Sequence, residues 1–188
     1  GFWDLKHEKR GDMWSASTIL AMVVAALILA RQYTGFPFNW RDPRQLNIYM
    51  EMASVLVPFF LWCGVNLALT SIMDGKGSFR DIFMTTAYAL TPIVLVHTPL
   101  ILVSRVITLD EGAFYYVFQI LAVIWAVFLL LVGMSTIHDY SFSKNLFTSG
   151  LTVAGIGVVI FLTLLFANVV AQLLGFVDTI WTEITFRV

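Results

Sequence analysis

Two short segments of the chain hold most of the side chains that could take part in charged recognition or catalysis. They are Asp74, Lys76, Arg80 and Asp81 in the first segment and His138, Asp139 and Tyr140 in the second. Each segment combines acids with basic or titratable groups, which suits charge pairing with a partner protein. We therefore predict that the two segments form one docking surface, with Gly75 and Gly77 allowing the first to turn tightly. The alternative is that these charges pair with one another or with lipid headgroups.

The residue pattern does not predict an enzyme. No Ser, His and acid trio is placed at a suitable depth for acyl transfer, and no pair of carboxylates lies inside an apolar segment for acid–base work. A metal site needs three or four converging ligands, whereas, with the N-terminus inside, His97 falls nearer the membrane face opposite His138. Cys63 is the only cysteine and cannot form an intrachain disulfide. We expect no catalytic residue, metal or cofactor.

The elements that must position these side chains are membrane spans. The chain is 59% hydrophobic and 12% charged, whereas a soluble domain has about 45–50% apolar and about 25% charged residues. Uncharged stretches cover residues 13–30, 52–73, 82–104, 112–137 and 145–177. Each is long enough for a span, which needs roughly 17–25 mostly apolar residues. A soluble helical domain would have too little polar surface to cover so many apolar helices.

The short connections between these stretches favour antiparallel neighbours. We predict an all-α membrane protein, with five transmembrane helices in one compact bundle and a single domain over residues 1–188. The expected spans are about 13–33, 50–73, 82–104, 112–137 and 146–175. Apolar residues recur at helical spacing in the tail 176–188, which indicates a helix on the membrane surface or the end of the fifth span.

The distribution of Lys and Arg gives a weak indication of orientation. With the N-terminus inside, six basic residues lie in the cytoplasm and five outside: Lys6, Lys9, Arg10, Lys76, Arg80 and Lys144 against Arg31, Arg41, Arg44, Arg105 and Arg187. The first cluster lies next to the first span, so we predict a cytoplasmic N-terminus. The net charge of −1 and the lack of a basic run exclude a nucleic-acid footprint.

Several residues inside the apolar stretches suggest helix packing or a lined cavity. Pro92 and Pro99 each remove a helical hydrogen bond, so we predict a kinked third span that either packs against its neighbours or lines a cavity together with Tyr88. Asn66 suits hydrogen bonding between helices. Small residues at the start of the fifth span, Gly150, Gly155 and Gly157, predict close approach of another helix.

The segment MDGKGSFRDIF at residues 73–83, followed by AYALTP at residues 87–92, resembles the signature of the Yip-one domain family. The resemblance extends from the first linker to Arg187. It implies a five-span membrane protein with a cytosolic N-terminus, and eukaryotic members of the family interact with Rab-type GTPases in vesicle traffic. Residues 58–62, 137–141 and 183–187 look like those of bacterial members, whose genes often lie beside carbohydrate ABC-transporter genes.

Residues and resemblance together predict a non-enzymatic accessory or scaffold subunit of a bacterial membrane transport complex. Its expected location is the bacterial cytoplasmic membrane. The expected partners are membrane lipids and other membrane subunits, such as the permease of a carbohydrate ABC transporter. Two alternatives stay open, which are a small permease or lipid-handling protein and a trafficking-type membrane adaptor.

Overall fold

The computed structural model describes residues 2–7, 11–39 and 46–186, and no strand occurs in these ranges. Seven α-helices follow one another: α1 (Phe2–His7), α2 (Met13–Tyr33), α3 (Ile48–Ile72), α4 (Phe79–Ala89), α5 (Thr91–Val103), α6 (Gly112–His138) and α7 (Phe142–Phe186). Short 3-10 turns, η1 (Phe36–Phe38) and η3 (Leu109–Glu111), lie between α2 and α3 and before α6. Helices α4 and α5 together form one span, so five helices are long and apolar enough to cross a membrane. The all-α prediction with five spans is confirmed.

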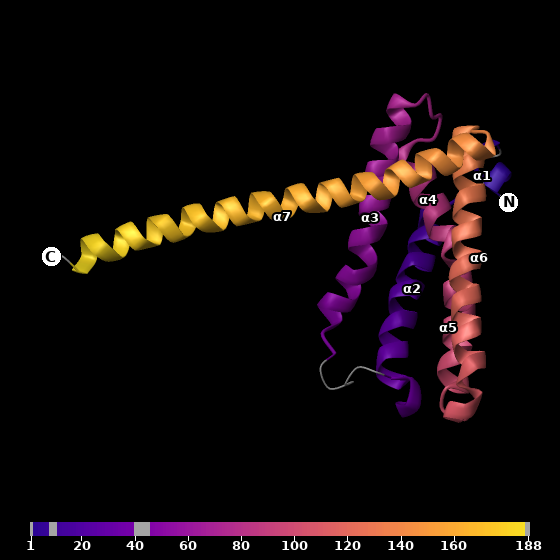
Figure 1. Ribbon diagram of the computed structural model, residues 1–188. Helices are drawn as coiled ribbons and strands as arrows, with labels where there is room; N and C mark the ends of the chain where they lie inside the picture. Colours follow the sequence, from indigo (N-terminus) through magenta and orange to yellow (C-terminus); the bar gives the residue numbers. More distant parts are fainter. Residues whose placement is uncertain (1, 8–10, 40–45, 187–188) are drawn as a thin grey trace.

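Four spans lie side by side: α2, α3, α4 with α5, and α6 (Figure 1). Small side chains lie where the helices approach one another, because Ala16, Ala26 and Ala122 are buried on otherwise apolar helices. In lipid, such close approach replaces the hydrophobic effect as the main source of helix association. Larger side chains then fill the core between α4 and α6, with Ile82, Met134 and Ile137 fully buried.

The third span is interrupted at Leu90, between α4 and α5 and two residues before Pro92, the first of its two prolines. Pro92 has no N–H to donate to the carbonyl of Tyr88, four residues earlier. That carbonyl instead accepts a hydrogen bond of 2.7 Å from the hydroxyl of Thr91. Helix α5 then continues from Thr91 to Val103 with Pro99 inside it. The two prolines therefore differ in effect, because only Pro92 lies where one helix ends and the next begins.

Helix α7 departs from the predicted compact bundle. It crosses the end of the other spans and extends away from them (Figure 1). Its buried residues, Asn145, Thr148, Ser149 and Thr152, all lie in its first turns. This polar stripe packs against α3 and α6, whereas the later turns are mostly apolar and exposed. The helix continues without interruption to Phe186, so residues 176–186 extend the fifth helix.

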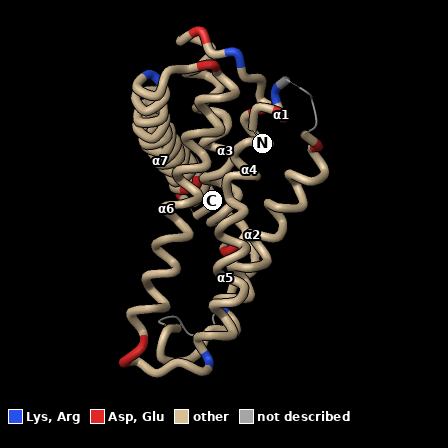
Figure 2. The backbone as a smooth tube through the Cα atoms, turned by 90° about the vertical axis from the view of Figure 1, so that its right-hand side faces the viewer, with Lys and Arg blue, Asp and Glu red and all other residues tan. Residues whose placement is uncertain are grey.

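Charged residues gather at the two ends of the packed spans (Figure 2). Helix α1, the turn between α3 and α4 and the turn between α6 and α7 lie at one end, which we call the α1 end. The other end holds η1 and the turn before α6, joined by a hydrogen bond of 2.9 Å from the Gly35 N–H to the Ser104 hydroxyl. Five residues of the orientation count lie outside the described ranges: Lys9, Arg10, Arg41, Arg44 and Arg187.

Candidate functional site

The two predicted docking segments lie together at the α1 end. The N–H of Gly77 donates to Nδ1 of His138 at 3.3 Å. The hydroxyl of Tyr140 donates to the carbonyl of Met73 at 2.9 Å. The turn after α3 and the turn after α6 are therefore hydrogen-bonded to each other, although they are far apart in the sequence.

Helices α3 and α6 end in the same way, each followed by an aspartate in the left-handed conformation. Asp74 has φ 58° and Asp139 has φ 55°. In each case the next residue donates its N–H back to the helix, Gly75 to Thr70 O at 2.7 Å and Tyr140 to Ser135 O at 3.1 Å. This is a Schellman-type ending, in which glycine is the usual left-handed residue and aspartate is tolerated.

The two glycines of the first turn let the His138 ring pack closely against the backbone. They do not supply the special backbone conformation that the sequence suggested. Neither Gly75 nor Gly77 has a positive φ. A Cβ on Gly75 would lie 2.7 Å from His138 Nδ1, and one on Gly77 would lie 2.8 Å from His138 Cε1. Both distances are too short for real contacts, so the imidazole occupies the space that side chains would need.

His138 connects three spans through a chain of buried hydrogen bonds. Because the Gly77 N–H donates to Nδ1, the ring proton lies on Nε2. Nε2 donates to Oδ1 of Asn66 in α3 at 3.2 Å, and the Asn66 amide donates to the Thr152 hydroxyl in α7 at 3.2 Å. His138 is 2% exposed and Asn66 1% exposed. Buried polar groups of this kind need all their partners, so the chain fixes how α3, α6 and α7 meet.

Tyr140 is also buried. Its ring stacks on His138, with 5.3 Å between ring centroids. The ammonium of Lys144 lies 4.3 Å from the centroid of the Tyr140 ring and donates to the Met73 carbonyl at 2.8 Å. Burial and the nearby Asp74 raise the pKa of Tyr140. His138 and Tyr140 therefore hold the two turns together and are not part of the exposed surface.

Asp139 lies between two lysines. Its carboxylate is 2.7 Å from Lys6 Nζ and 3.1 Å from Lys76 Nζ. Hydrogen bonds from these two ammonium groups lower the pKa of Asp139. Because Lys6 belongs to α1, the carboxylate joins the N-terminal helix to both turns.

Asp81 and Arg80 follow the first turn but behave differently. Asp81 accepts hydrogen bonds from the Ser78 hydroxyl at 2.7 Å and the Ser78 N–H at 3.0 Å, which caps the N-terminus of α4. Arg80 is exposed and has no ion-pair partner among the described residues. Four charged side chains in and next to the two turns are exposed, namely Asp74, Lys76, Arg80 and Asp139, and we call them the exposed charge set.

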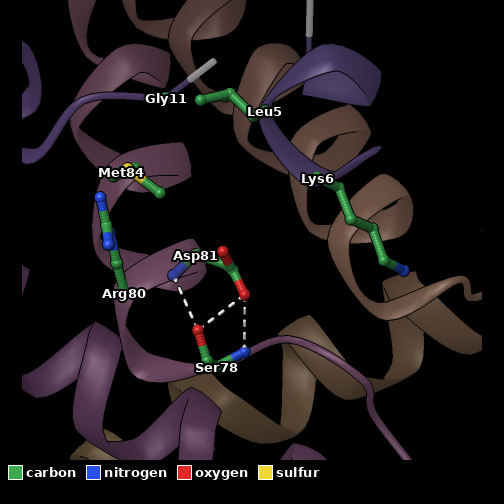
Figure 3. A pocket seen from close by; sticks show the side chains of 7 residues that line it. All are labelled: Leu5, Lys6, Gly11, Ser78, Arg80, Asp81 and Met84. Carbon is green, nitrogen blue, oxygen red and sulfur yellow. Dashed lines mark hydrogen bonds between the residues drawn. The ribbon is translucent and has the colours of Figure 1, made fainter. Parts of the chain in front are cut away.

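A cavity of about 320 Å³ lies beside this set, between α1 and α4. Its walls are formed by Leu5, Lys6, Gly11, Ser78, Arg80, Asp81 and Met84 (Figure 3). The Lys6 ammonium points away from Ser78 and Asp81, and the Asp81 carboxylate is held by Ser78 (Figure 3). The described residues contain no group of three His, Cys, Asp or Glu side chains close enough to hold a metal ion.

The residues predicted for packing or a cavity are distributed over the spans. The Tyr88 hydroxyl donates to the Asp12 carbonyl at 3.4 Å. Pro92 is buried and Pro99 is exposed, and neither lines the cavity beside α1. A Cβ on Gly155 would lie 2.8 Å from Val65 Cγ1, whereas one on Gly150 or Gly157 would meet nothing within 4 Å. Only Gly155 faces another helix.

Three contributors to this site were not among the predicted residues: Lys6, Lys144 and Thr152. A signal for Thr152 was present, because polar residues recur at Asn145, Thr148 and Thr152 on one face of the fifth segment. The roles of Lys6 and Lys144 depend on where α1 and the start of α7 pack, which local spacing does not reveal.

A comparison of the sequence with models of protein families identifies its family. The model of the Yip1 domain matches residues 1–165. The chain belongs to the Yip1 domain family. This confirms the resemblance seen in the sequence, and with five candidate spans it makes the chain a multi-pass integral membrane protein. Searches of curated proteins and of solved structures gave no match.

Proposed function

We propose that this protein is a non-enzymatic scaffold subunit of a membrane transport complex, and that its exposed charge set docks another subunit. The observation that carries the proposal is that Asp74, Lys76, Arg80 and Asp139 lie in or next to two turns that buried side chains hold together. A surface that keeps its shape loses little conformational entropy on binding. Acids and bases on one rigid surface also give specificity through charge complementarity.

The buried residues supply this rigidity. His138 and Tyr140 fill the space between the turns, and their hydrogen bonds reach Gly77, Met73 and Asn66. The shape of both turns is therefore set by these contacts and not by the charges themselves. Asp74 and Arg80 are then available to pair with a partner, whereas Asp139 already pairs with Lys6 and with Lys76 of the same set.

The proposal includes an orientation and a location. We place the α1 end in the cytoplasm of a bacterial cell, since the basic residues Lys6, Lys76, Arg80 and Lys144 all belong to that end. A docking surface there would face the cytoplasmic parts of a transporter. The permease of a carbohydrate ABC transporter is the partner that the resemblance to bacterial members favours.

The test is co-purification from the native membrane in mild detergent, followed by mass spectrometry of the eluate. Asp74→Ala and Arg80→Ala should reduce recovery of the partner tenfold or more, which corresponds to about 1.4 kcal/mol or more of binding free energy. Thermal melting should change little for Arg80→Ala because its side chain is exposed. Asp74→Asn keeps a residue that tolerates the left-handed backbone, and it should reduce recovery as Asp74→Ala does without the backbone strain. Asp110→Ala is the matched control, since Asp110 is an exposed acid at the opposite end. Undiminished recovery with both substitutions would contradict the docking role.

A further inference from the structure

A second cavity lies at the end of the spans opposite α1. It has a volume of about 360 Å³, near the lower limit of about 300–1,000 Å³ for small-molecule sites. Helix α2 contributes Leu27 and Arg31, η1 contributes Phe38, and α3 contributes Glu51. Tyr115 of α6 completes the apolar side of the wall. Among the described residues, the lining therefore combines apolar and uncharged polar side chains with one acid and one base.

The acid and the base form an ion pair that is largely withdrawn from solvent. Nη1 of Arg31 contacts Oε1 of Glu51, and the side chains are 17% and 15% exposed. Replacing such a pair by apolar side chains of similar size is often neutral or even stabilising. Stability alone therefore gives no reason for charges at this place.

The ion pair with Glu51 leaves part of the hydrogen-bonding capacity of the Arg31 guanidinium unsatisfied. Its Nε is buried and has no hydrogen-bond partner among the described residues. A buried N–H without a partner is costly, and a guanidinium prefers to bind a carboxylate or a phosphate through two N–H groups at once. An anionic oxygen in the cavity would complete the donor set of Arg31, while Glu51 could accept from an ammonium group.

The pair also lies at the depth of lipid headgroups. Arg31 is in the last turn of α2 (Met13–Tyr33), and Glu51 is in the first turn of α3 (Ile48–Ile72). At about 1.5 Å of rise per residue, each lies within roughly 5 Å of its helix end. Charged headgroups and the ends of spanning helices meet at this level.

We propose that this cavity binds the headgroup of a phospholipid that carries both a phosphate and a primary ammonium, as in phosphatidylethanolamine. The phosphate binds Arg31 through Nε, and the ammonium donates to Glu51. The acyl chains run along the apolar surfaces of α2 and α3. A lipid with a net negative headgroup is disfavoured, because Glu51 repels it and Arg31 is the one basic residue among the described residues that line the cavity. A trimethylammonium headgroup has no N–H to donate to Glu51.

The experiment is native mass spectrometry of the full-length protein in micelles that contain equal amounts of phosphatidylethanolamine, phosphatidylglycerol and phosphatidylcholine. The expected result is at least tenfold greater retention of phosphatidylethanolamine than of the other two. Arg31→Met with Glu51→Met should abolish this preference without lowering the melting temperature. Lys76→Gln at the α1 end is the control and should retain the lipid as the unmodified protein does.

Unchanged retention in the double variant, or equal retention of the three lipids by the unmodified protein, would overturn the proposal. If the double variant does not fold, Arg31→Lys replaces it, because lysine keeps the positive charge but has no planar fork. Retention should again fall tenfold, and unchanged retention again rejects the site. Soluble O-phosphoethanolamine added at the lipid's concentration should not displace the lipid. Displacement would assign the cavity to a soluble zwitterion and overturn the lipid assignment.

Discussion

The N–H of Gly77 donates to Nδ1 of His138 at 3.3 Å, and this bond joins the turn after α3 to the last residue of α6. It also fixes the ring proton on Nε2, which lets His138 donate to Asn66 at 3.2 Å. One imidazole thus bonds to two separate parts of the chain, one through each ring nitrogen. The packing of the two turns therefore depends on this side chain together with Tyr140.

Gly77→Ala should therefore lower stability. The new Cβ would lie 2.8 Å from Cε1 of His138, so either the ring or the turn must move. Overpacking of this kind typically costs about 1–3 kcal/mol. Thermal melting in detergent measures the effect, and Gly150→Ala is the control because its Cβ meets nothing within 4 Å. Equal melting temperatures for the two variants would contradict the close packing at Gly77.

His138 and Asn66 should be energetically coupled. His138→Phe leaves the Gly77 N–H and Asn66 Oδ1 without a partner, which predicts a loss of about 1–3 kcal/mol. Asn66→Leu removes the other side of the same bond. A double-mutant cycle on unfolding free energies should give a coupling of ~1 kcal/mol. Additive effects of the two substitutions would show that the bond contributes nothing to stability.

The spans were predictable from the sequence because their signal is local. Runs of uncharged apolar residues are long enough to cross a membrane, and helices occur at each of them. The sequence also predicted that the turns after α3 and after α6 lie at the same end, since alternate connections of antiparallel helices emerge on one side. The turns that hold Asp74 and Asp139 are accordingly hydrogen-bonded to each other.

The roles of individual residues were less predictable, because they depend on which side chains fill the space between distant turns. His138 and Tyr140 carry polar groups, which suggested an exposed surface, yet both are buried by contacts with residues 70–77. The direction of α7 was equally hidden. Its apolar turns give the same signal whether the helix packs in a bundle or extends away from it.

Gly155 and Gly157 should respond differently to the same change. Gly155→Leu places a side chain against Val65, 2.8 Å from the first added carbon, so the contact between α7 and α3 must open. Gly157→Leu adds a side chain to open space. Yield and monodispersity on size-exclusion chromatography should fall for the first variant only. A fall with Gly157→Leu would show that α7 packs more extensively than its first turns do.

Asp139 should stabilise the α1 end in a pH-dependent way. Its pKa lies below the ordinary value because Lys6 and Lys76 donate hydrogen bonds to the charged form. The stabilisation is therefore fully present above the pKa of the unfolded chain and is lost as the pH falls through the lower, folded pKa. Asp139→Asn keeps the left-handed backbone but lacks the charge. The melting temperatures of the two proteins should differ at pH 7 and converge as the pH falls below the ordinary aspartate pKa; a constant difference would contradict the ion-pair contribution.

Cysteine labelling should separate the two ends of the packed spans. Lys76 is 69% exposed at the α1 end, and Asp110 is exposed in η3 at the other end. The buried Cys63 can be replaced by serine, which leaves a background without thiols. In that background, an impermeant maleimide should label Asp110→Cys in intact cells and Lys76→Cys only after the membrane is opened.

The fold and the orientation are tested separately by this pair of variants. If four spans cross the membrane side by side, one variant alone should react in intact cells, whichever way the protein faces. Reaction of both in intact cells would contradict the separation of the two ends. Reaction of Lys76→Cys alone would keep the fold but reverse the orientation. In that case the exposed charge set would face outward, and a cytoplasmic partner could not bind it.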